Sequence, residues 1–202
     1  MSERKYLTQY EVECLLLQAQ KGDNAERNYC MIYMSFIHGF RVSEVCHLRL
    51  SDLDLEGHCL YIRRMKSGFC TNHPLLEGEF QAIKAWLAIR TRSLGADSEW
   101  LFISRQGKAL TRQRVYQIIS QLGKDAGLPV GSHPHMLRHA CGFALADRGI
   151  DTRLIQDYLG HKNIRHTVRY TASNAERFAD IWASTKIKRK TRRLGPNCQI
   201  VY

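Results

Sequence analysis

Long apolar runs are missing from the sequence: no stretch approaches the roughly eighteen residues that a membrane-spanning helix needs. The opening segment, MSERKYLTQYEV, also has no apolar core of the kind found in secretory signals. From these two absences we expect a chain with no membrane partner.

Pairs of cysteines at metal-binding spacing are absent as well. The seven cysteines are odd in number and scattered, with no C-x-x-C motif. Several of them, including Cys14 and Cys30, stand inside apolar patterns, where a reduced cysteine behaves as a small hydrophobic side chain. We therefore expect a reducing compartment and no disulfide framework.

Acidic residues are few relative to basic ones. Nineteen Asp and Glu stand against thirty Lys and Arg, which gives a formal net charge of +11 and a pI near 9.5. Such an excess favours an anionic partner, with nucleic acid first and an acidic membrane surface second. Near its end the chain reads KIKRKTRR, which we expect to be a solvated tail that contacts phosphates without sequence preference.

Internal repeats, low-complexity tracts and Gly/Ser linkers are also absent, and 202 residues suffice for one well-buried core. Apolar positions at helical spacing dominate, while residues 58–75 look like an antiparallel hairpin with Lys66 at its tip. The sequence therefore predicts a mainly α fold with a small antiparallel β-hairpin or sheet (α+β). The expected elements are a helix capped by Thr8, helices over about 25–38, 79–93, 111–126, 135–148, 151–160, 167–170 and 173–184, and a short strand at WLFIS, residues 100–104.

The stretch HPHMLRHACG, residues 133–142, raises the alternatives of a metal site and a phosphate site. Zinc needs three or four ligands, but His135 and His139 lack the glutamate of an H-E-x-x-H motif and no cysteine pair is present. His135 and Arg138 are three positions apart, hence on one side of a helix whose first-turn N–H groups favour an anion. The stretch therefore predicts phosphate binding and no metal.

Further candidate residues stand where elements end. Arg41 follows a helix that Gly39 stops, and Lys66 lies at the hairpin tip. His161 follows the YLG turn, nine residues before Tyr170. Each has a structural explanation on its own, such as a charge that complements a helix dipole or an aromatic ring that packs. As an ordered set, they indicate a shared anionic ligand.

Four motifs in this order, GFRVSE, HMLRH, LGH and HTVRYT, resemble those of the tyrosine recombinases, also called the phage integrase family. Lys66 in the hairpin fits the lysine of that family. The resemblance covers nearly the whole chain. The run from HPHMLRHACGFAL to NIRHTVRYTASNA is similar to that of the short DNA invertases that switch fimbrial promoters in enterobacteria.

The resemblance implies DNA cleavage and rejoining without a metal or a cofactor. Tyr170 would attack the scissile phosphate and form a 3′-phosphotyrosyl link. Arg41 and Arg138 would clamp the non-bridging oxygens, since a planar guanidinium matches phosphate geometry. His161 would donate a hydrogen bond to the developing charge, and Lys66 would protonate the departing 5′ oxygen.

Three more residues belong to the expected site. His135 would serve Tyr170 as a base or an orienting partner. Glu44, about one helical turn from Arg41, would hold the region of that arginine by hydrogen bonding. His139 is expected to pack behind the site rather than to act directly.

Double-stranded DNA with inverted-repeat sites is the expected partner, bound by a homotetramer together with accessory DNA-bending proteins. The expected location is the cytoplasm, at the bacterial nucleoid. Side chains suited to base reading in the major groove are Arg112, Gln113, Arg114, Gln117 and Arg165, and those expected to contact phosphates from the tail are Lys188, Arg189 and Lys190.

Longer recombinases of the family carry a separate N-terminal helical domain, whereas here the catalytic pattern begins by residue 7. We expect one catalytic domain over residues 1–185 and a basic tail over 186–202. The expected activity is metal-independent, site-specific recombination that inverts a promoter-containing segment and so controls fimbrial phase variation. A topoisomerase-like nicking enzyme and a non-catalytic DNA-binding regulator stay open as alternatives.

Overall fold

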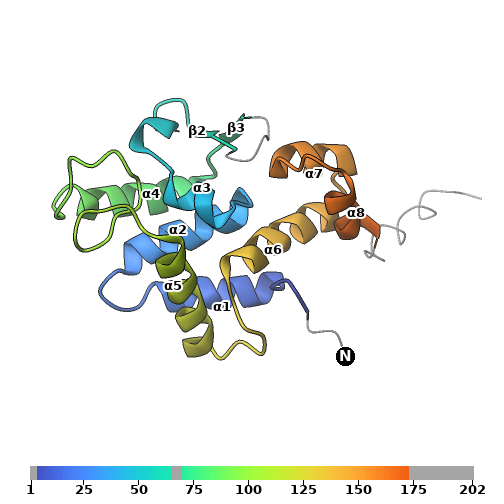
Figure 1. Ribbon diagram of the computed structural model, residues 1–202, viewed down its shortest axis with the longest axis horizontal. Coiled ribbons are helices and arrows are strands. Elements are labelled where there is room, and N and C mark those ends of the chain that lie inside the picture. The colour runs from blue at the N-terminus through green and yellow to red at the C-terminus, as the bar shows by residue number, and fades with distance from the viewer. Residues whose placement is uncertain (1–3, 65–69, 173–202) are drawn as a thin grey trace, which may run out of the picture.

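The computed structural model describes residues 4–64 and 70–172, which form a group of helices and a small sheet (Figure 1). The predicted α+β class, mainly helical, is confirmed. The helices are α1 (Gln9–Ala19), α2 (Ala25–Ile37), α3 (Val42–Cys46), α4 (Glu77–Arg90), α5 (Arg112–Asp125), α6 (Pro134–Asp147), α7 (Thr152–Leu159) and α8 (Arg165–Ala172). A 3-10 turn, η1 (Leu50–Asp52), precedes the strands β1 (Leu53–Asp54), β2 (Cys59–Ile62) and β3 (Thr71–Pro74).

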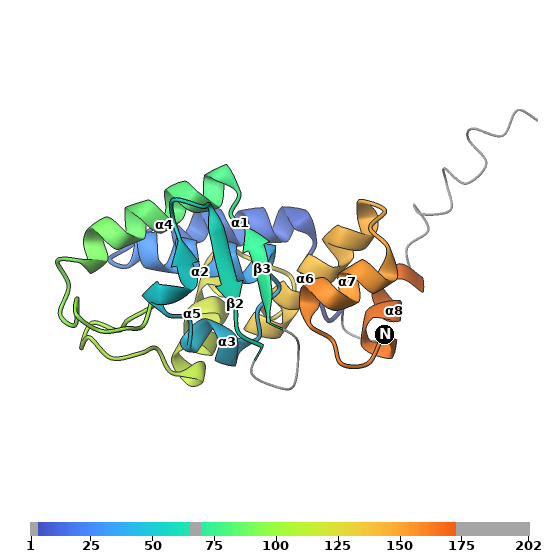
Figure 2. The ribbon, with the colours of Figure 1, turned by 90° about the horizontal axis from the view of Figure 1, so that it is seen from above.

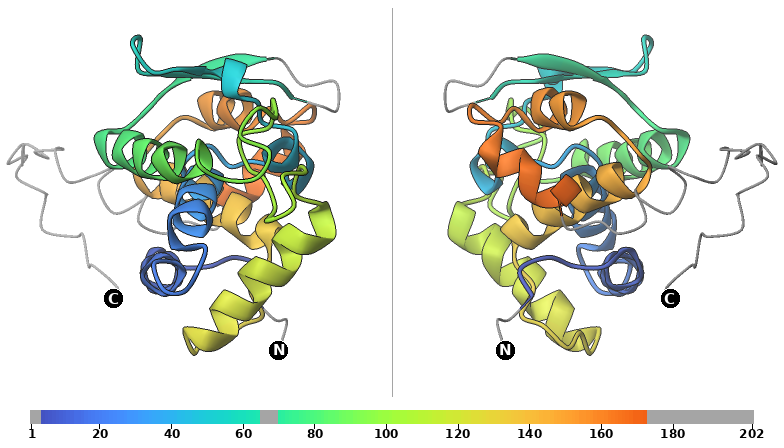
Figure 3. Two further views of the ribbon diagram at one scale, coloured as in Figure 1. Left: turned by 90° about the vertical axis from the view of Figure 1, so that its left-hand side faces the viewer. Right: turned by 90° about the vertical axis from the view of Figure 1, so that its right-hand side faces the viewer.

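The three strands form an antiparallel sheet in the order β1-β2-β3, which lies as an outer layer on one side of the helices (Figures 2 and 3). Leu60 of β2 is paired with His73 of β3. Along β2, buried Leu60 and Ile62 alternate with exposed Tyr61, because successive side chains of a strand point to opposite faces. The predicted hairpin is therefore present, with its strands where the sequence placed them.

Two hydrophobic clusters hold the helices together. In the larger one, α2 is central and contacts α1, α4 and α6, with Met31 of α2 buried in the same core as Leu15 and Ile83. The smaller cluster joins α6, α7 and α8 through buried residues that include Leu159 and Tyr170. The second cluster thus fixes α8 against α6, and Figure 1 shows the three helices gathered at one end of the molecule.

Side-chain caps fix several helix starts, as the sequence predicts. Thr8 and Glu11 form a capping box at the start of α1. Thr111 accepts a first-turn backbone N–H of α5, and Asp151 does the same for α7. After Leu159, α7 ends at Gly160, whose φ of 64° is left-handed and carries no Cβ penalty.

The prediction of a strand at WLFIS is wrong, because residues 100–104 form no regular strand. Trp100 and Ile103 instead make isolated bridges, to Arg49 and to Ala109. The segment changes its pairing partner between these two bridges, so neither of them extends into a ladder. Helix α8 is also longer than the helix expected over 167–170.

Some predictions fall outside the described residues. They are Lys66 at the hairpin tip, the helix expected over 173–184 and the tail with Lys188, Arg189 and Lys190. Among the described helices, none is both long and apolar enough to cross a membrane.

Candidate active site

Three arginines from different elements converge on the C-terminal end of α7. Arg64, just after β2, donates to the carbonyl of Tyr158 at 2.5 Å. Arg138 of α6 donates to that of Leu159 at 2.7 Å, and Arg41 donates to that of Gly160 at 3.2 Å. The last carbonyls of a helix lack intrahelical partners and form the negative end of its dipole. The end of α7 therefore gathers cations that would otherwise repel one another.

A single buried carboxylate, that of Glu44, joins two of these arginines. Its Oε1 accepts from Arg41 at 2.7 Å, and its Oε2 accepts from Arg64 at 2.8 Å. Oε2 also accepts the backbone N–H of Arg41, at 2.8 Å, which ties the start of α3 to the cluster. The hydrogen bonds expected from Glu44 to the region of Arg41 are present. Arg41 itself is the N-cap of α3, not merely a residue beyond the end of α2.

Arg64 is a member of the cluster that the sequence reasoning missed. Its side chain is completely buried, and its Nε has no hydrogen-bond partner among the described residues. The alternation of buried and exposed residues along β2 would have predicted that Arg64 points inward. Buried Leu60 and Ile62 are followed by buried Arg64, whereas Arg63 is exposed.

The cluster has an excess of positive charge. Burial, together with repulsion from Arg41 and Arg64, lowers the pKa of Arg138 to about 10. Of the three guanidinium groups, those of Arg41 and Arg64 pair with the Glu44 carboxylate, whereas that of Arg138 donates to backbone carbonyls. An anion with several acceptor oxygens would relieve this repulsion, and a phosphate group fits two planar guanidinium groups at once.

Tyr170 is buried beside this cluster, on α8. Its hydroxyl lies 2.8 Å from Nδ1 of His139, and only 1% of the residue is exposed. Burial raises the pKa of Tyr170 to about 12. Gly142 permits the close approach of α8 to α6, because a Cβ there would lie 2.5 Å from a carbon of the tyrosine ring. The phenol is therefore protonated at neutral pH.

The structure places His139, rather than His135, against the Tyr170 hydroxyl. Burial, with help from His135 and Arg169, lowers the pKa of His139 to about 4, so its ring is neutral at pH 7 and able to accept a proton. His135 lies on the exposed side of α6, with its ring centre 4.4 Å from that of His139. His139, expected as a supporting residue behind the site, thus contacts the Tyr170 hydroxyl directly.

His161 lies between the arginine cluster and Tyr170. Its ring is 6.2 Å from the tyrosine ring, centre to centre, and its Nδ1 is 2.9 Å from the Thr167 hydroxyl. Burial, then repulsion from Arg138 and Arg41, lowers the pKa of His161 to about 3. The ring is thus neutral, and the hydroxyl contact engages one nitrogen, which leaves Nε2 for a ligand.

The structure therefore brings together most of the predicted catalytic set and leaves part of it unplaced. Lys66 lies outside the described residues. In the described ranges no group of three or more His, Cys, Asp and Glu side chains is arranged to hold a metal ion. The predicted base-reading residues are exposed, on the first turns of α5 and at the start of α8: Arg112, Gln113, Arg114, Gln117 and Arg165.

Comparison with known proteins agrees with this geometry. The model of the phage integrase family matches residues 5–177. The type 1 fimbriae regulatory protein FimB of Escherichia coli strain K12 is 62% identical over 180 residues, which cover 89% of this chain and 90% of that protein. The corresponding protein FimE of the same strain is 52% identical over 183 residues, with 90% and 92% covered.

Among solved structures, the fold resembles that of the XerH site-specific recombinase in its post-cleavage complex with a palindromic difH substrate. The TM-score is 0.74 at 27% identity, and the match covers 88% of this chain and 53% of XerH, so this chain spans about half the length of that one. The sequence motifs, the gathered arginines and these similarities agree with one another. The chain belongs to the phage integrase family, the tyrosine recombinases.

Proposed function

We propose that the chain is a site-specific DNA recombinase that inverts a segment between inverted repeats and so controls fimbrial phase variation. The observation that carries the proposal is the convergence of Arg41, Arg138 and His161 beside the buried hydroxyl of Tyr170. The high identity to FimB and FimE supports the fimbrial assignment. DNA as the partner is supported by the similarity to XerH in complex with its substrate.

In the proposed reaction, the arginines exchange the carbonyls of α7 for the oxygens of the scissile phosphate. Tyr170 gives its proton to a neutral histidine, and the geometry favours His139 for this step. The tyrosine oxygen then forms a bond to phosphorus, and the bond from phosphorus to the 5′ oxygen breaks. Lys66 supplies the proton that the 5′ oxygen takes up, and the reverse sequence rejoins the strand.

His135 also belongs to the proposed set. Placed next to His139 on the exposed side of α6, it is positioned to take part once DNA covers the site. We further propose a homotetramer on DNA with accessory bending proteins, no metal or cofactor, and action at the nucleoid in the cytoplasm. The single catalytic domain over 1–185 and phosphate contacts by the tail over 186–202 are part of the same proposal.

The experiment uses a supercoiled plasmid that carries a candidate inverted-repeat switch. Wild type, Tyr170→Phe and Tyr10→Phe are incubated with it in EDTA, and covalent complexes are trapped in detergent. Tyr10 is the matched control because the residue is 73% exposed on α1, and no hydrogen bond or ring contact of the described residues joins it to the site. We expect a covalent complex with wild type and with Tyr10→Phe only.

Three other results would contradict parts of the proposal. Equal complexes from wild type and Tyr170→Phe would mean that another residue attacks. Relaxation of plasmids that carry a single site, without inversion of paired sites, would favour a topoisomerase-like enzyme. Binding without any covalent complex would favour a regulator.

A further inference from the structure

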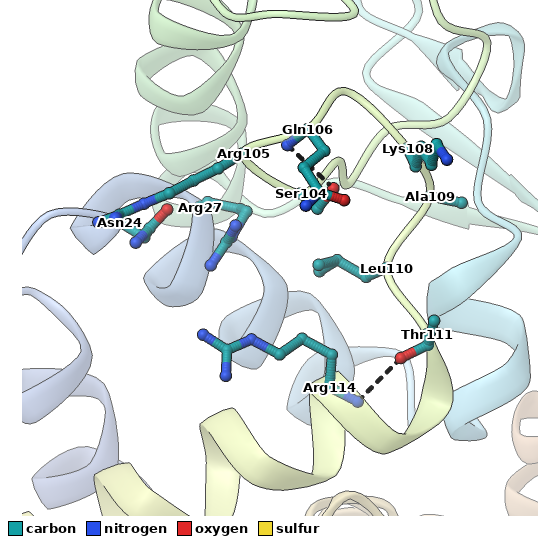
Figure 4. A pocket seen from close by; sticks show the side chains of 10 residues that line it. All are labelled: Asn24, Arg27, Ser104, Arg105, Gln106, Lys108, Ala109, Leu110, Thr111 and Arg114. Atoms are coloured by element: carbon teal, nitrogen blue, oxygen red, sulfur yellow. Dashed lines mark hydrogen bonds between the residues drawn. The ribbon is translucent and has the colours of Figure 1, made fainter.

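A basic cavity lies outside the candidate active site, between the start of α2, the segment 103–110 and the start of α5 (Figure 4). Its volume is about 570 Å³. Four of its lining residues are cationic, and the described lining contains no Asp or Glu: the cations are Arg27, Arg105, Lys108 and Arg114. The proposed recombination chemistry uses none of these side chains, so the cavity needs a separate explanation.

Arg27 is the buried cation of this cavity. Only 5% of the residue is exposed, and its guanidinium donates to neutral acceptors, the carbonyl of Ile103 at 3.2 Å and the amide oxygen of Asn28 at 3.0 Å. No carboxylate of the described residues pairs with it. Burial, with repulsion from Arg114 and Arg105, lowers the pKa of Arg27 to about 10. A buried cation without a counter-charge is costly, so the cavity favours an anion.

Arg114 is the second cation directed into this space. In Figure 4 its guanidinium projects from the first turn of α5 toward that of Arg27. Among the described residues no hydrogen bond or ion pair reaches the Arg114 guanidinium, although its backbone N–H donates to Thr111. The N-terminal end of α5, with its free N–H groups and positive dipole end, lies at the same rim.

The two other cations of the cavity, Arg105 and Lys108, are both exposed. Arg105 forms an exposed ion pair with Asp23 at 2.6 Å, so its charge is already partly balanced. Lys108 lies on the opposite side of the cavity from Arg27 and is exposed (Figure 4). A pair of converging guanidinium groups backed by a helix N-terminus matches the several acceptor oxygens of a phosphate.

We propose that this cavity binds a phosphate group of the DNA backbone, separate from the scissile phosphate. The inference rests on the proposed function, since it takes DNA as the partner. DNA is favoured over a free anion because Arg114 belongs to the same helix turn as Arg112 and Gln113, the exposed residues expected to read bases. Arg114 then anchors the backbone beside the bases that α5 reads and does not itself read a base, contrary to the sequence-based expectation.

The first test compares Arg114→Gln with Lys124→Gln. Both changes remove one exposed positive charge from α5, but Lys124 lies in the last turn, away from the cavity. Dissociation constants are measured across a salt titration on switch DNA and on DNA of scrambled sequence. We expect Arg114→Gln to weaken binding about tenfold on both DNAs and to reduce the salt slope by about 1, and Lys124→Gln to change binding much less. A loss confined to switch DNA would mean that Arg114 reads a base and would overturn the proposal.

The second test locates the phosphate. Neutral methylphosphonates replace the backbone phosphates one at a time, and binding is measured with Tyr170→Phe and with the Tyr170→Phe/Arg114→Gln double variant. We expect one phosphate position, other than the scissile one, at which the neutral replacement weakens DNA binding by Tyr170→Phe. At that position it should have little effect on DNA binding by the double variant. If every position affects both proteins equally, no backbone phosphate binds in the cavity.

A third arm separates a free anion from DNA. Inorganic pyrophosphate is added to wild type and to Arg114→Gln without DNA, and thermal midpoints are compared. Stabilisation of wild type alone, with no methylphosphonate position that distinguishes the variants, would assign the cavity to a soluble anion and overturn the DNA proposal. Because all these readouts measure binding, a failure of covalent trapping by Tyr170 would contradict the proposed recombination without affecting them.

Discussion

Nδ1 of His139 lies 2.8 Å from the hydroxyl of Tyr170, although the two residues belong to different helices, α6 and α8. This contact gives the buried phenol one polar partner that is neutral at pH 7. It also fixes the direction of the hydroxyl relative to Arg138, the residue that precedes His139 on α6. The pair therefore joins the proposed nucleophile to the helix that carries Arg138.

The first prediction concerns this histidine. In His139→Gln, cleavage of a nicked substrate that traps the covalent intermediate should slow by a factor of about 100, because the variant lacks the proton acceptor of Tyr170. Its affinity for DNA should stay near that of wild type, since His139 is buried. His135→Gln serves as the comparison. A larger loss in His135→Gln than in His139→Gln would show that the base changes when DNA binds.

Arg64 should be essential for the stability of the cluster. Arg64→Met leaves Glu44 without one of its two partners and the carbonyl of Tyr158 without its donor, so the free energy of unfolding should fall by about 3 kcal/mol. Arg63→Met, at the neighbouring position, is the comparison: Arg63 is half exposed, so its loss should cost less than that of Arg64 even though it pairs with buried Asp52. Urea unfolding measures both. Equal midpoints for the two variants would mean that the buried arginine is dispensable for the fold.

Gly142 should tolerate no side chain. In Gly142→Ala the new Cβ would stand 2.5 Å from the ring of Tyr170, so the ring or α8 must move. We expect a loss of about 1–3 kcal/mol in unfolding free energy, together with slower covalent complex formation. Gly131→Ala places its Cβ in open space and is the control. An unchanged rate in Gly142→Ala would argue that Tyr170 leaves this position before it attacks.

Stability should fall as the pH is lowered from 7 to 4. Burial, then repulsion from His38 and Arg64, lowers the pKa of His73 to about 3, so below about pH 6.5 the unfolded chain holds a proton that the folded protein lacks. The contribution of His73 is therefore fully present above about pH 6.5 and is lost progressively as the pH falls toward about 3. In His73→Gln the free energy of unfolding should fall less steeply with decreasing pH, by up to about 1.4 kcal/mol per pH unit. Urea unfolding of both proteins at several pH values measures this slope. Parallel curves for the two proteins would contradict the assignment to His73.

The sequence by itself determined most of the helices, although not the short α3, and the order of the chemical groups. Caps such as Thr8, Thr111 and Asp151 act within a single turn, and the apolar spacing of a helix repeats within four residues, so both can be read locally. The motifs around Arg41 and Tyr170 likewise depend on neighbours in the chain. The family and its expected chemistry were therefore predictable.

Only the tertiary structure decided which of these groups touch. His135 and His139 share a stretch of α6, and nothing local indicates which one meets Tyr170; the packing of α8 on α6 chooses His139. The place of Arg64 at the end of α7 and the direction of Arg114 toward Arg27 depend in the same way on elements far apart in the chain. Contacts of this kind depend on how helices and strands pack against one another. They are stabilised by burial of the whole hydrophobic core, which no short stretch of sequence specifies.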